Sequence, residues 1–275
     1  TALGRVQEAQ GDYPAAIATH RAALDLHATR DTTAAAYWDA ATQLANAHFY
    51  AGNYDTADSL NRLVLAADRA RRGAGHPAVA EDLINLGATQ FERGNYAEAE
   101  EYYRQALAIN RAWYGEDHHA VAANLTMIGR VQIRALRWED AVGALEEALA
   151  IRERVFGPDH PNVASTVNEL GTVALRRERF EEAERHYLRA NAIYRATYGD
   201  RHYLVGITLS NLGSVGMGRQ DNAAAERYLR QAVALFTEAL GPDHSNVGIA
   251  RTKLGRALLR QGKYREAIEE STAGY

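Results

Sequence analysis

The chain has 275 residues, of which 47% are hydrophobic and 24% charged, which argues against a disordered chain because disordered segments contain few apolar residues. The formal net charge is −4, from 31 basic and 35 acidic side chains, and no run of like charge resembles a phosphate-binding tail, so we expect no nucleic-acid partner. Without cysteine, disulfides, thiolate nucleophiles and thiolate zinc ligands are excluded. No apolar run approaches the roughly 20 residues of a membrane span, and no targeting segment is visible. We therefore expect a cytoplasmic protein with no membrane partner.

Several residue types recur along the chain with one common period. Histidine and glycine each return every 42 residues, at His76, His118, His160, His202 and His244 and at Gly87, Gly129, Gly171, Gly213 and Gly255. An aromatic residue followed by alanine three positions later keeps the same interval, for example at Tyr96 and Ala99. A fixed period of this length indicates a repeat architecture. We predict seven repeats, approximately 1–30, 31–73, 74–115, 116–157, 158–199, 200–241 and 242–275.

Within each repeat the spacing of apolar residues predicts two helices. In the third repeat, Leu83, Leu86 and Phe91 fall at helical intervals, and a glycine at Gly94 is suited to the left-handed end of the helix. A second helix follows from Tyr96 until Gly115. The same reading of every repeat predicts fourteen helices and no strand, with the densest burial at Leu86, Ile128, Leu170 and Leu212.

The residue pattern resembles the tetratricopeptide repeat. It consists of Leu86-Gly87, a turn at Gly94-Asn95-Tyr96, Ala99 and a final Ala106-Leu107. The 42-residue length and the Gly-x-x-His-Pro linker further resemble the long repeats of kinesin light chains and of many bacterial signalling proteins. The resemblance implies an all-α, right-handed superhelical solenoid of about seven helix-turn-helix units, the first and last incomplete.

The N-terminal repeats depart from this pattern. The stretch from Leu26 to Ala36 lacks the Gly-x-x-His element, and His20 and Asn61 stand where later repeats have an aromatic residue or leucine. We therefore expect the first two repeats to pack differently. We also expect Thr1 to start inside a first helix and Tyr275 to stop inside a second, so that both ends leave apolar surface for further sequence or for end-to-end self-association.

The candidate chemical groups favour folding over catalysis. The periodic histidines are spread along the repeats and cannot share a metal ion, so we expect each to cap or pack a linker. His118 and His119 are adjacent, and we expect them to point apart. The Gly213 to Gly218 stretch lies in mid-helix by register and lacks the strand that precedes a dinucleotide site. We therefore expect no enzyme, no catalytic residue, no metal and no cofactor.

Function is then expected on the surface formed by the first helices, where the resemblance implies that partner peptides bind beside the Leu-Gly pair. Asn46 and Asn85 match two asparagines of the carboxylate clamp of chaperone-binding repeats, but Thr42, Ala123 and Met127 occupy the places of its basic members. Arginine is the commonest residue at the remaining positions of this wall. The predicted peptide-binding residues are Asn46, Asn85, Arg130, Arg134, Arg176, Asn211, Arg256 and Arg260.

Three hypotheses of function remain open. The chain is a non-catalytic protein-binding scaffold that holds an extended, acidic peptide in its concave groove through arginines and asparagine amides. Alternatively, it is a regulatory or self-associating segment of a multidomain signalling protein, which senses a peptide or packs on an effector domain. A catalytic solenoid is the third hypothesis, and we disfavour it.

Overall fold

A computed structural model describes residues 1–274, which form fourteen α-helices and no strand. The helices are α1 (Ala2–Ala9), α2 (Tyr13–Ala28), α3 (Ala35–Tyr50), α4 (Tyr54–Arg72), α5 (Pro77–Glu92), α6 (Tyr96–Tyr114), α7 (His119–Arg134), α8 (Trp138–Phe156), α9 (Pro161–Arg176), α10 (Phe180–Tyr198), α11 (Tyr203–Gly218), α12 (Asn222–Leu240), α13 (Ser245–Leu259) and α14 (Tyr264–Ala273). The predicted all-α fold is confirmed. The prediction for Tyr275 lies outside the described residues. Thr1 does not lie inside a helix as expected, because it is the N-cap of α1 and its hydroxyl accepts from the Gly4 N–H at 3.2 Å.

The 42-residue register holds for both helices of the central repeats. The first helices α5, α7, α9 and α11 have 16 residues each, and the second helices α6, α8, α10 and α12 have 19. In both series every helix begins 42 residues after its predecessor. The boundaries of the seven repeats themselves stay a prediction.

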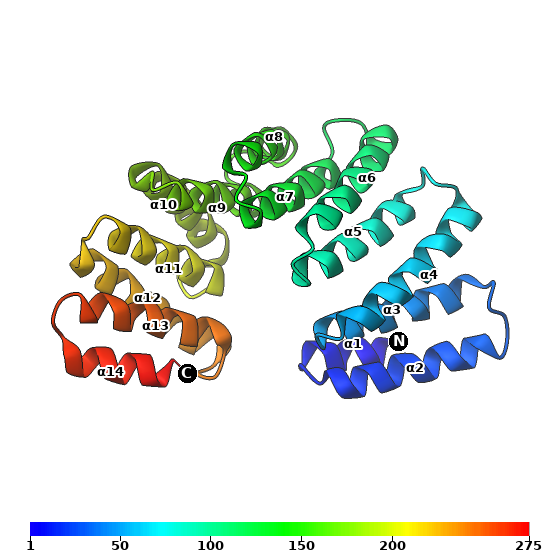
Figure 1. The fold of residues 1–275 in the computed structure, drawn as a ribbon, viewed down its shortest axis with the longest axis horizontal. Helices are drawn as coiled ribbons and strands as arrows, with labels where there is room; N and C mark the ends of the chain where they lie inside the picture. Colours follow the sequence, from blue (N-terminus) through cyan, green and yellow to red (C-terminus); the bar gives the residue numbers. More distant parts are fainter. Residues whose placement is uncertain (275) are drawn as a thin grey trace. The chain divides into compact units, whose positions relative to one another are not determined.

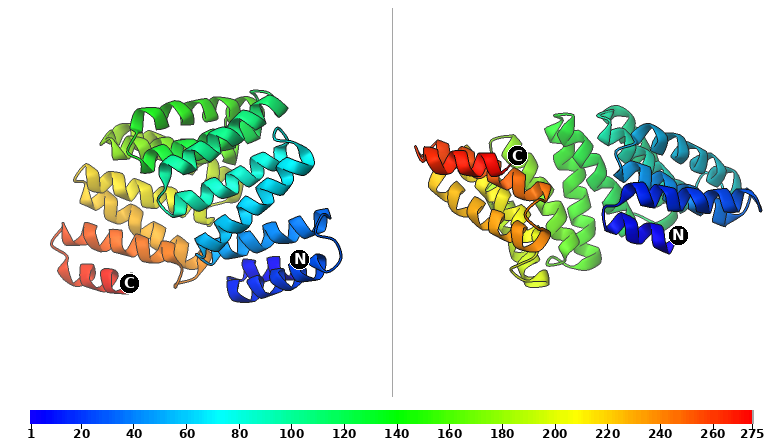
Figure 2. Two further views of the ribbon diagram at one scale, coloured as in Figure 1. Left: turned by 45° about the vertical axis from the view of Figure 1, so that its right-hand side comes forward. Right: turned by 90° about the horizontal axis from the view of Figure 1, so that it is seen from below.

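The chain divides into two compact units, Thr1–Arg137 with α1 to α7 and Trp138–Tyr275 with α8 to α14. Within each unit, successive helices run antiparallel and lie side by side (Figures 1 and 2). In the second unit the first helices also touch one another, because α11 contacts both α9 and α13. First helices are therefore packed on more sides than second helices.

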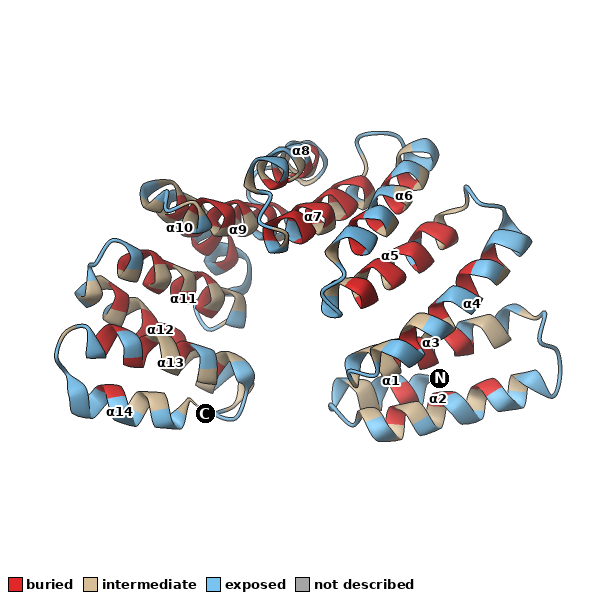
Figure 3. Cartoon of the chain, viewed as in Figure 1, coloured by how far each residue is buried: buried red, intermediate tan, exposed pale blue. Residues whose placement is uncertain are grey.

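Burial follows this arrangement, with long runs of buried residues on the first helices (Figure 3). In the second unit, α11 has nine buried residues and α12 has four. The predicted burial is confirmed at Leu86, Ile128, Leu170 and Leu212, whose exposed fractions are 0, 2, 6 and 2%.

The five periodic histidines are N-caps of first helices, as expected. In each, the ring Nδ1 accepts a hydrogen bond from the backbone N–H two residues later, at 3.1 to 3.3 Å. Three of these rings also stack on the aromatic residue that precedes the linker, at Tyr114, Phe156 and Tyr198. A neutral imidazole with its proton on Nε2 satisfies this geometry. The linker histidines therefore stabilise the helix starts.

The expected separation of His118 and His119 is wrong. Their ring centroids lie 4.2 Å apart. His118 is the N-cap, outside the helix, and only His119 has helical geometry, so the rule that neighbours on a helix point apart does not apply to this pair.

Close approach of the two helices in a hairpin depends on the glycine after the leucine. A Cβ atom added at Gly87 would lie 2.5 Å from the Tyr103 ring, and one at Gly171 would lie 2.8 Å from the Tyr187 ring. Gly4 stands in the same relation to His20, which is fully buried. The expectation that the first repeat packs differently is therefore wrong at this contact, since an imidazole takes the place of the phenol ring.

This contact predicts opposite effects for the same substitution at two helical glycines. Gly171→Ala should destabilise the protein, because overpacking costs about 1–3 kcal/mol and outweighs the gain in helix propensity of about 1 kcal/mol. Gly143→Ala is the matched control, since Gly143 is exposed within α8 and an added Cβ meets nothing within 4 Å. It should stabilise the protein by up to about 1 kcal/mol. Urea unfolding followed by circular dichroism measures both, and equal effects would contradict the close-approach argument.

Candidate functional site

The predicted peptide-binding residues lie on the first-helix face, by which we mean the surface formed by the first helices within one unit. Asn46, Asn85, Arg130 and Arg134 belong to the first unit, on α3, α5 and α7. Arg176, Asn211 and Arg256 belong to the second unit, on α9, α11 and α13, and Arg260 is the C-cap of α13. All five arginines are exposed and the three asparagines are half-buried.

Polar side chains connect neighbouring first helices of the second unit. The Asn211 amide donates to Asn168 Oδ1 at 3.0 Å, and Lys253 Nζ donates to Ser210 Oγ at 3.1 Å. Arg260 donates to the Met217 carbonyl oxygen at 3.0 Å. Each bond reaches back 43 residues, which is one repeat plus one position. Asn211 and Arg260 are thus already engaged within the chain.

Three basic groups gather on the same face of the second unit. Burial of the half-buried Lys253 lowers its pKa, and the charges of Arg176 and Arg256 lower it further. None of the three side chains forms an ion pair with an acidic residue of the described chain. Between α9 and α13, helix α11 contributes the small side chain of Ser214 and the glycine Gly218 at the repeat positions of Arg256 and Arg176. The Phe180 ring fills the space beside Gly218, so the cluster is distinguished by positive charge that no acidic side chain of the described residues compensates.

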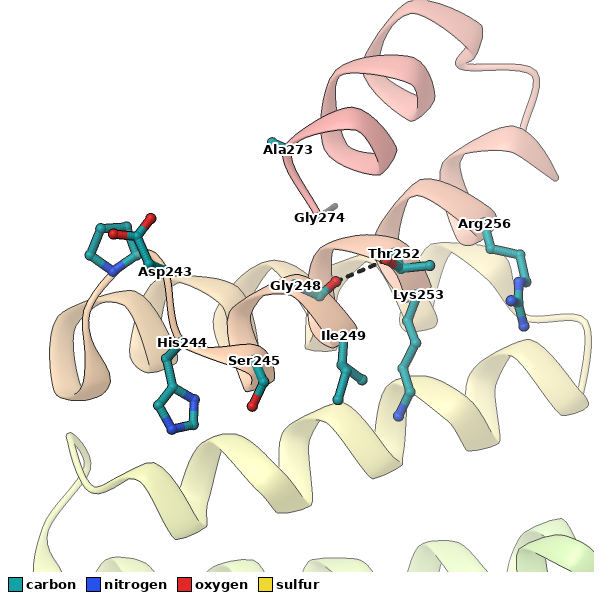
Figure 4. Close-up of a pocket in the computed structure, with 11 residues that line it drawn as sticks. Asp243, His244, Ser245, Gly248, Ile249, Thr252, Lys253, Arg256, Ala273 and Gly274 are labelled. Atoms are coloured by element: carbon teal, nitrogen blue, oxygen red, sulfur yellow. Dashed lines mark hydrogen bonds between the residues drawn. The ribbon is translucent and has the colours of Figure 1, made fainter. Parts of the chain in front are cut away.

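A cavity of about 710 Å³ adjoins this cluster (Figure 4). It is lined by Lys253, Arg256 and other residues of α13, by the preceding linker residues Pro242, Asp243 and His244, and by Ala273 and Gly274. Ile249, Lys253 and Arg256 project from one side of α13. The cavity begins beyond the last turn of α14, which has 10 residues where α12 has 19. At the equivalent place beside Gly206, the ring of Phe236 fills the space. The volume thus reflects the length of α14, whereas the basic side chains belong to the first-helix face.

In the first unit, the two arginines of α7 have partners in the chain. Arg134 lies 6.0 Å from the Phe91 ring centroid and 5.9 Å from that of Tyr96, and its Nε donates to the Tyr96 hydroxyl at 3.3 Å. Arg130 lines a cavity of about 240 Å³ together with Phe91, Tyr103, Met127 and Glu92. This pair is less available for a ligand than its spacing indicates.

Sequence reasoning missed a polar contact that recurs where a second helix meets the next first helix. Asn110 of α6 donates to Asn124 of α7 at 2.7 Å, and Arg152 of α8 donates to Thr166 of α9 at 2.5 Å. At the junction of α4 and α5, the equivalent positions are occupied by Asp68 and Asp82, and both are buried. The signal was present in the sequence, because these residues also follow the 42-residue period.

Asp82 is the buried member of this acidic pair without a partner. Its exposed fraction is 6% and its Oδ2 has no hydrogen bond, whereas Asp68 pairs with Arg71 and Arg72 at 3.4 and 3.3 Å. Burial raises the pKa of Asp82 to about 7, and repulsion from Asp68 and Glu81 adds to the rise against the opposing effect of Arg72 and Arg69.

Two further findings limit the chemistry of the described residues. Among residues 1–274, no group of three histidine or acidic side chains is placed to hold a metal ion. Within the same range, no helix combines the length and hydrophobicity that crossing a bilayer requires.

Stacked helical hairpins with a polar first-helix face define a repeat protein of the protein-interaction class. The family model for the tetratricopeptide repeat matches residues 32–112, 85–154, 133–196, 162–224 and 204–270, and a second tetratricopeptide repeat model matches residues 1–34. The chain belongs to the tetratricopeptide repeat family. Among curated proteins, no sequence matches it significantly.

Solved structures with low sequence identity share the fold. A kinesin light chain-like protein of Podospora anserina with nearly identical TPR-like repeats is 22% identical, with a TM-score of 0.60 over 72% of this chain and 94% of that one. The apo form of RapI is 14% identical, with a TM-score of 0.73 over 98% and 93%. The Cut9–Hcn1 hetero-tetramer of the APC/C contains a chain that is 17% identical, with a TM-score of 0.67 over 94% of this chain and 43% of that one. The predicted tetratricopeptide repeat is confirmed by the family models, and a kinesin light chain-like protein is among the structures that share its fold.

The raised pKa of Asp82 makes stability depend on pH. Between about pH 4, near the ordinary value of an aspartate, and about pH 7, the folded state keeps a proton that the unfolded state releases, so the free energy of unfolding falls as pH rises. Asp82→Asn removes this penalty and should stabilise the protein by roughly 1–3 kcal/mol at pH 8. The gain should shrink towards zero at pH 4.

Urea unfolding at several pH values measures the difference between Asp82→Asn and the unsubstituted chain. Asp25→Asn serves as the matched control, because Asp25 is an exposed carboxylate of the same unit that forms no ion pair, and it should change little at any pH. A gain from Asp82→Asn that is the same at pH 4 and pH 8 would show that Asp82 is not held protonated.

Proposed function

We propose that the chain is a non-catalytic, cytoplasmic protein-interaction module whose first-helix face binds an extended, acidic peptide segment of a partner protein. The observation that carries the proposal is the cluster of Arg176, Lys253 and Arg256 in the second unit, three basic groups without an acidic partner in the described chain. Membership of the tetratricopeptide repeat family supports protein binding in general. The neighbour in the Cut9–Hcn1 hetero-tetramer is an example of this fold in an assembly with another protein.

A bound carboxylate would convert an unfavourable arrangement into a favourable one. Burial lowers the pKa of Lys253, and repulsion from the positive charges of Arg176 and Arg256 lowers it further. Carboxylates between them would form charge-assisted hydrogen bonds, each contributing about 1.5–3 kcal/mol. A ligand can bind Arg176 and Arg256 without first breaking an ion pair of these side chains. Many arginines on the second helices, such as Arg189 and Arg230, already pair with glutamates.

The remaining predicted residues have supporting roles in this proposal. Asn211 and Arg260 hold neighbouring first helices together through Asn168 and Met217, so they set the spacing of the face. Asn46 and Asn85 belong to the first unit, where both are half-buried on first helices, and we propose them for main-chain contacts with a segment bound to that unit. Arg130 and Arg134 are secondary, because aromatic side chains already occupy Arg134.

The proposal is tested with three labelled nonapeptides in a glycine-serine background, which carry three glutamates, three glutamines or three lysines. Fluorescence anisotropy with the full chain should show binding of the glutamate peptide and none of the glutamine peptide, and the affinity for the glutamate peptide should fall as salt rises from about 50 to 300 mM, because screening weakens exposed charge pairs. The double variant described next should not weaken binding of the lysine peptide, because a cation gains nothing from these arginines. The double variant Arg176→Gln/Arg256→Gln should bind the glutamate peptide at least about 10-fold more weakly, the equivalent of one charge-assisted hydrogen bond.

Arg185→Gln/Arg227→Gln is the matched control, because both of its arginines are exposed on second helices and form no ion pair with any residue from 1 to 274. It carries the same net charge as the test variant and should bind like the unsubstituted chain. If the two double variants weakened binding of the glutamate peptide equally, the loss of affinity would come from net charge alone, and the proposed site would be wrong.

Association of copies is a second candidate, favoured by exposed apolar side chains on the outermost helices of the described chain. Leu3 of α1 is 60% exposed, and Ile268 of α14 is 67% exposed. Such a surface would suit a self-associating or regulatory segment of a signalling protein. Light scattering across a concentration series separates the candidates, because association that Ile268→Glu abolishes would favour this one.

A further inference from the structure

We propose that a polar cavity in the first unit binds a cationic side chain, a lysine or arginine of a partner, through the carboxyl groups of Asp39, Glu81 and Asp82. The cavity has a volume of about 510 Å³ and lies between α1, α3, α4 and α5. The inference concerns a different unit and the opposite charge from the proposed acidic-peptide site, and it does not rest on that site.

The balance of charge in this cavity favours a cation. Asp68 is neutralised by Arg71 and Arg72 at 3.4 and 3.3 Å. Asp39, Glu81 and Asp82 line the cavity and form no ion pair within the described chain. The lining also includes Arg5 and Thr1, whose amino group contacts the buried His20 ring at 3.3 Å. Three unpaired carboxyl groups therefore stand against two cationic groups without an acidic partner among residues 1–274, the Arg5 guanidinium and the Thr1 ammonium, which leaves an excess of one carboxyl group.

Asp82 supplies the second, independent observation. Its side chain lines the cavity while 94% of its surface is buried, corresponding to an exposed fraction of 6%, and its Oδ2 has no hydrogen-bond partner. The equivalent residue one repeat later, Asn124, receives a hydrogen bond from Asn110 at 2.7 Å. An ammonium or guanidinium group would provide the donors that Asp82 lacks.

The chemistry points to an organic cation rather than to a metal ion. No three acidic or histidine side chains within residues 1–274 converge closely enough to hold a metal. A cavity of this volume, with carboxyl groups spread over three helices and the Asn85 amide in its lining, suits a side chain of extended shape. The Asn85 amide can bind the main chain that carries it.

Binding should release a proton. The carboxyl of Asp82 has a pKa of about 7, raised by burial and by Asp68 and Glu81 and lowered by Arg72 and Arg69. A cation beside it favours the ionised form and lowers this pKa. Affinity for a cationic side chain should therefore increase from pH 6 to pH 8, which is the reverse of the effect of pH on stability.

The test uses acetylated pentapeptide amides in a glycine-serine background, with a central lysine, acetyl-lysine or norleucine. Calorimetry with the full chain should detect the lysine peptide only, with an affinity about 10-fold higher at pH 8 than at pH 6, and carbon-13 spectra should show the Asp82 carboxyl ionising at lower pH when the peptide is present. Asp82→Asn should weaken binding at least 10-fold and abolish the pH dependence, while raising the melting temperature.

Opposite changes in affinity and stability distinguish loss of a site from loss of the fold. Asp39→Asn/Glu81→Gln should also weaken binding of the lysine peptide, and Asp25→Asn should leave it unchanged. Binding of the glutamate nonapeptide should survive Asp82→Asn, so the two proposals fail separately. Equal binding of the lysine and norleucine peptides, or undiminished binding of lysine by Asp82→Asn, would overturn the inference.

Discussion

Every feature of this protein depends on how closely the two helices of a hairpin can approach. The contact is made by the residue after the leucine of the first helix and the residue sixteen positions later on the second, as in Gly87 with Tyr103 and Gly213 with Leu229. The absence of a Cβ atom lets a ring or a branched side chain lie directly on the helix backbone, where interiors pack at crystal-like density. This contact sets the position of the first helices that carry the glycine, whereas α3 has the buried Ala45 at this place. The first helices carry the candidate sites.

The fold could be read from the sequence because its determinants are local and repeated. A 42-residue period, a glycine near the end of the first helix and histidine N-caps each act within one hairpin. Where the turn lacks its glycine, the same turn still forms. Leu136, Glu178 and Gln220 adopt a positive φ of 58 to 62° at the turn position that glycine occupies in other repeats. Neighbouring contacts in each hairpin impose that conformation at the usual cost of about 1 kcal/mol or more. The contact at His20 was misjudged because an imidazole stands where later repeats have an aromatic residue or leucine, and it fills the same place against Gly4.

The candidate sites were less predictable because they depend on contacts between repeats. Spacing placed Arg130 and Arg134 on one face of α7, but the aromatic pair Phe91 and Tyr96 of the preceding hairpin takes up Arg134. Lys253 gained significance only when Arg176, two repeats earlier, proved near enough to depress its pKa. Asp82 was overlooked because acidic residues at helix surfaces are usually solvated, and only the packing of α4 against α5 buries it. Periodicity predicts where a side chain lies on its helix, and partners in adjacent repeats determine whether it is available.

Asp82 and Lys253 share a property that folding alone does not explain. Each is an ionisable group held where burial and like charges oppose its charged form. In a neighbouring repeat the equivalent position holds a neutral asparagine that forms a hydrogen bond, Asn124 for Asp82 and Asn211 for Lys253. An uncharged amide would serve the packing equally well and would remove the electrostatic penalty. A ligand of opposite charge removes the same penalty by pairing with the group, so the stability given up in the unliganded protein is recovered as binding free energy. The two units would then differ in the sign of charge they recognise, since the group whose charged form is opposed is a carboxyl in one and an ammonium in the other.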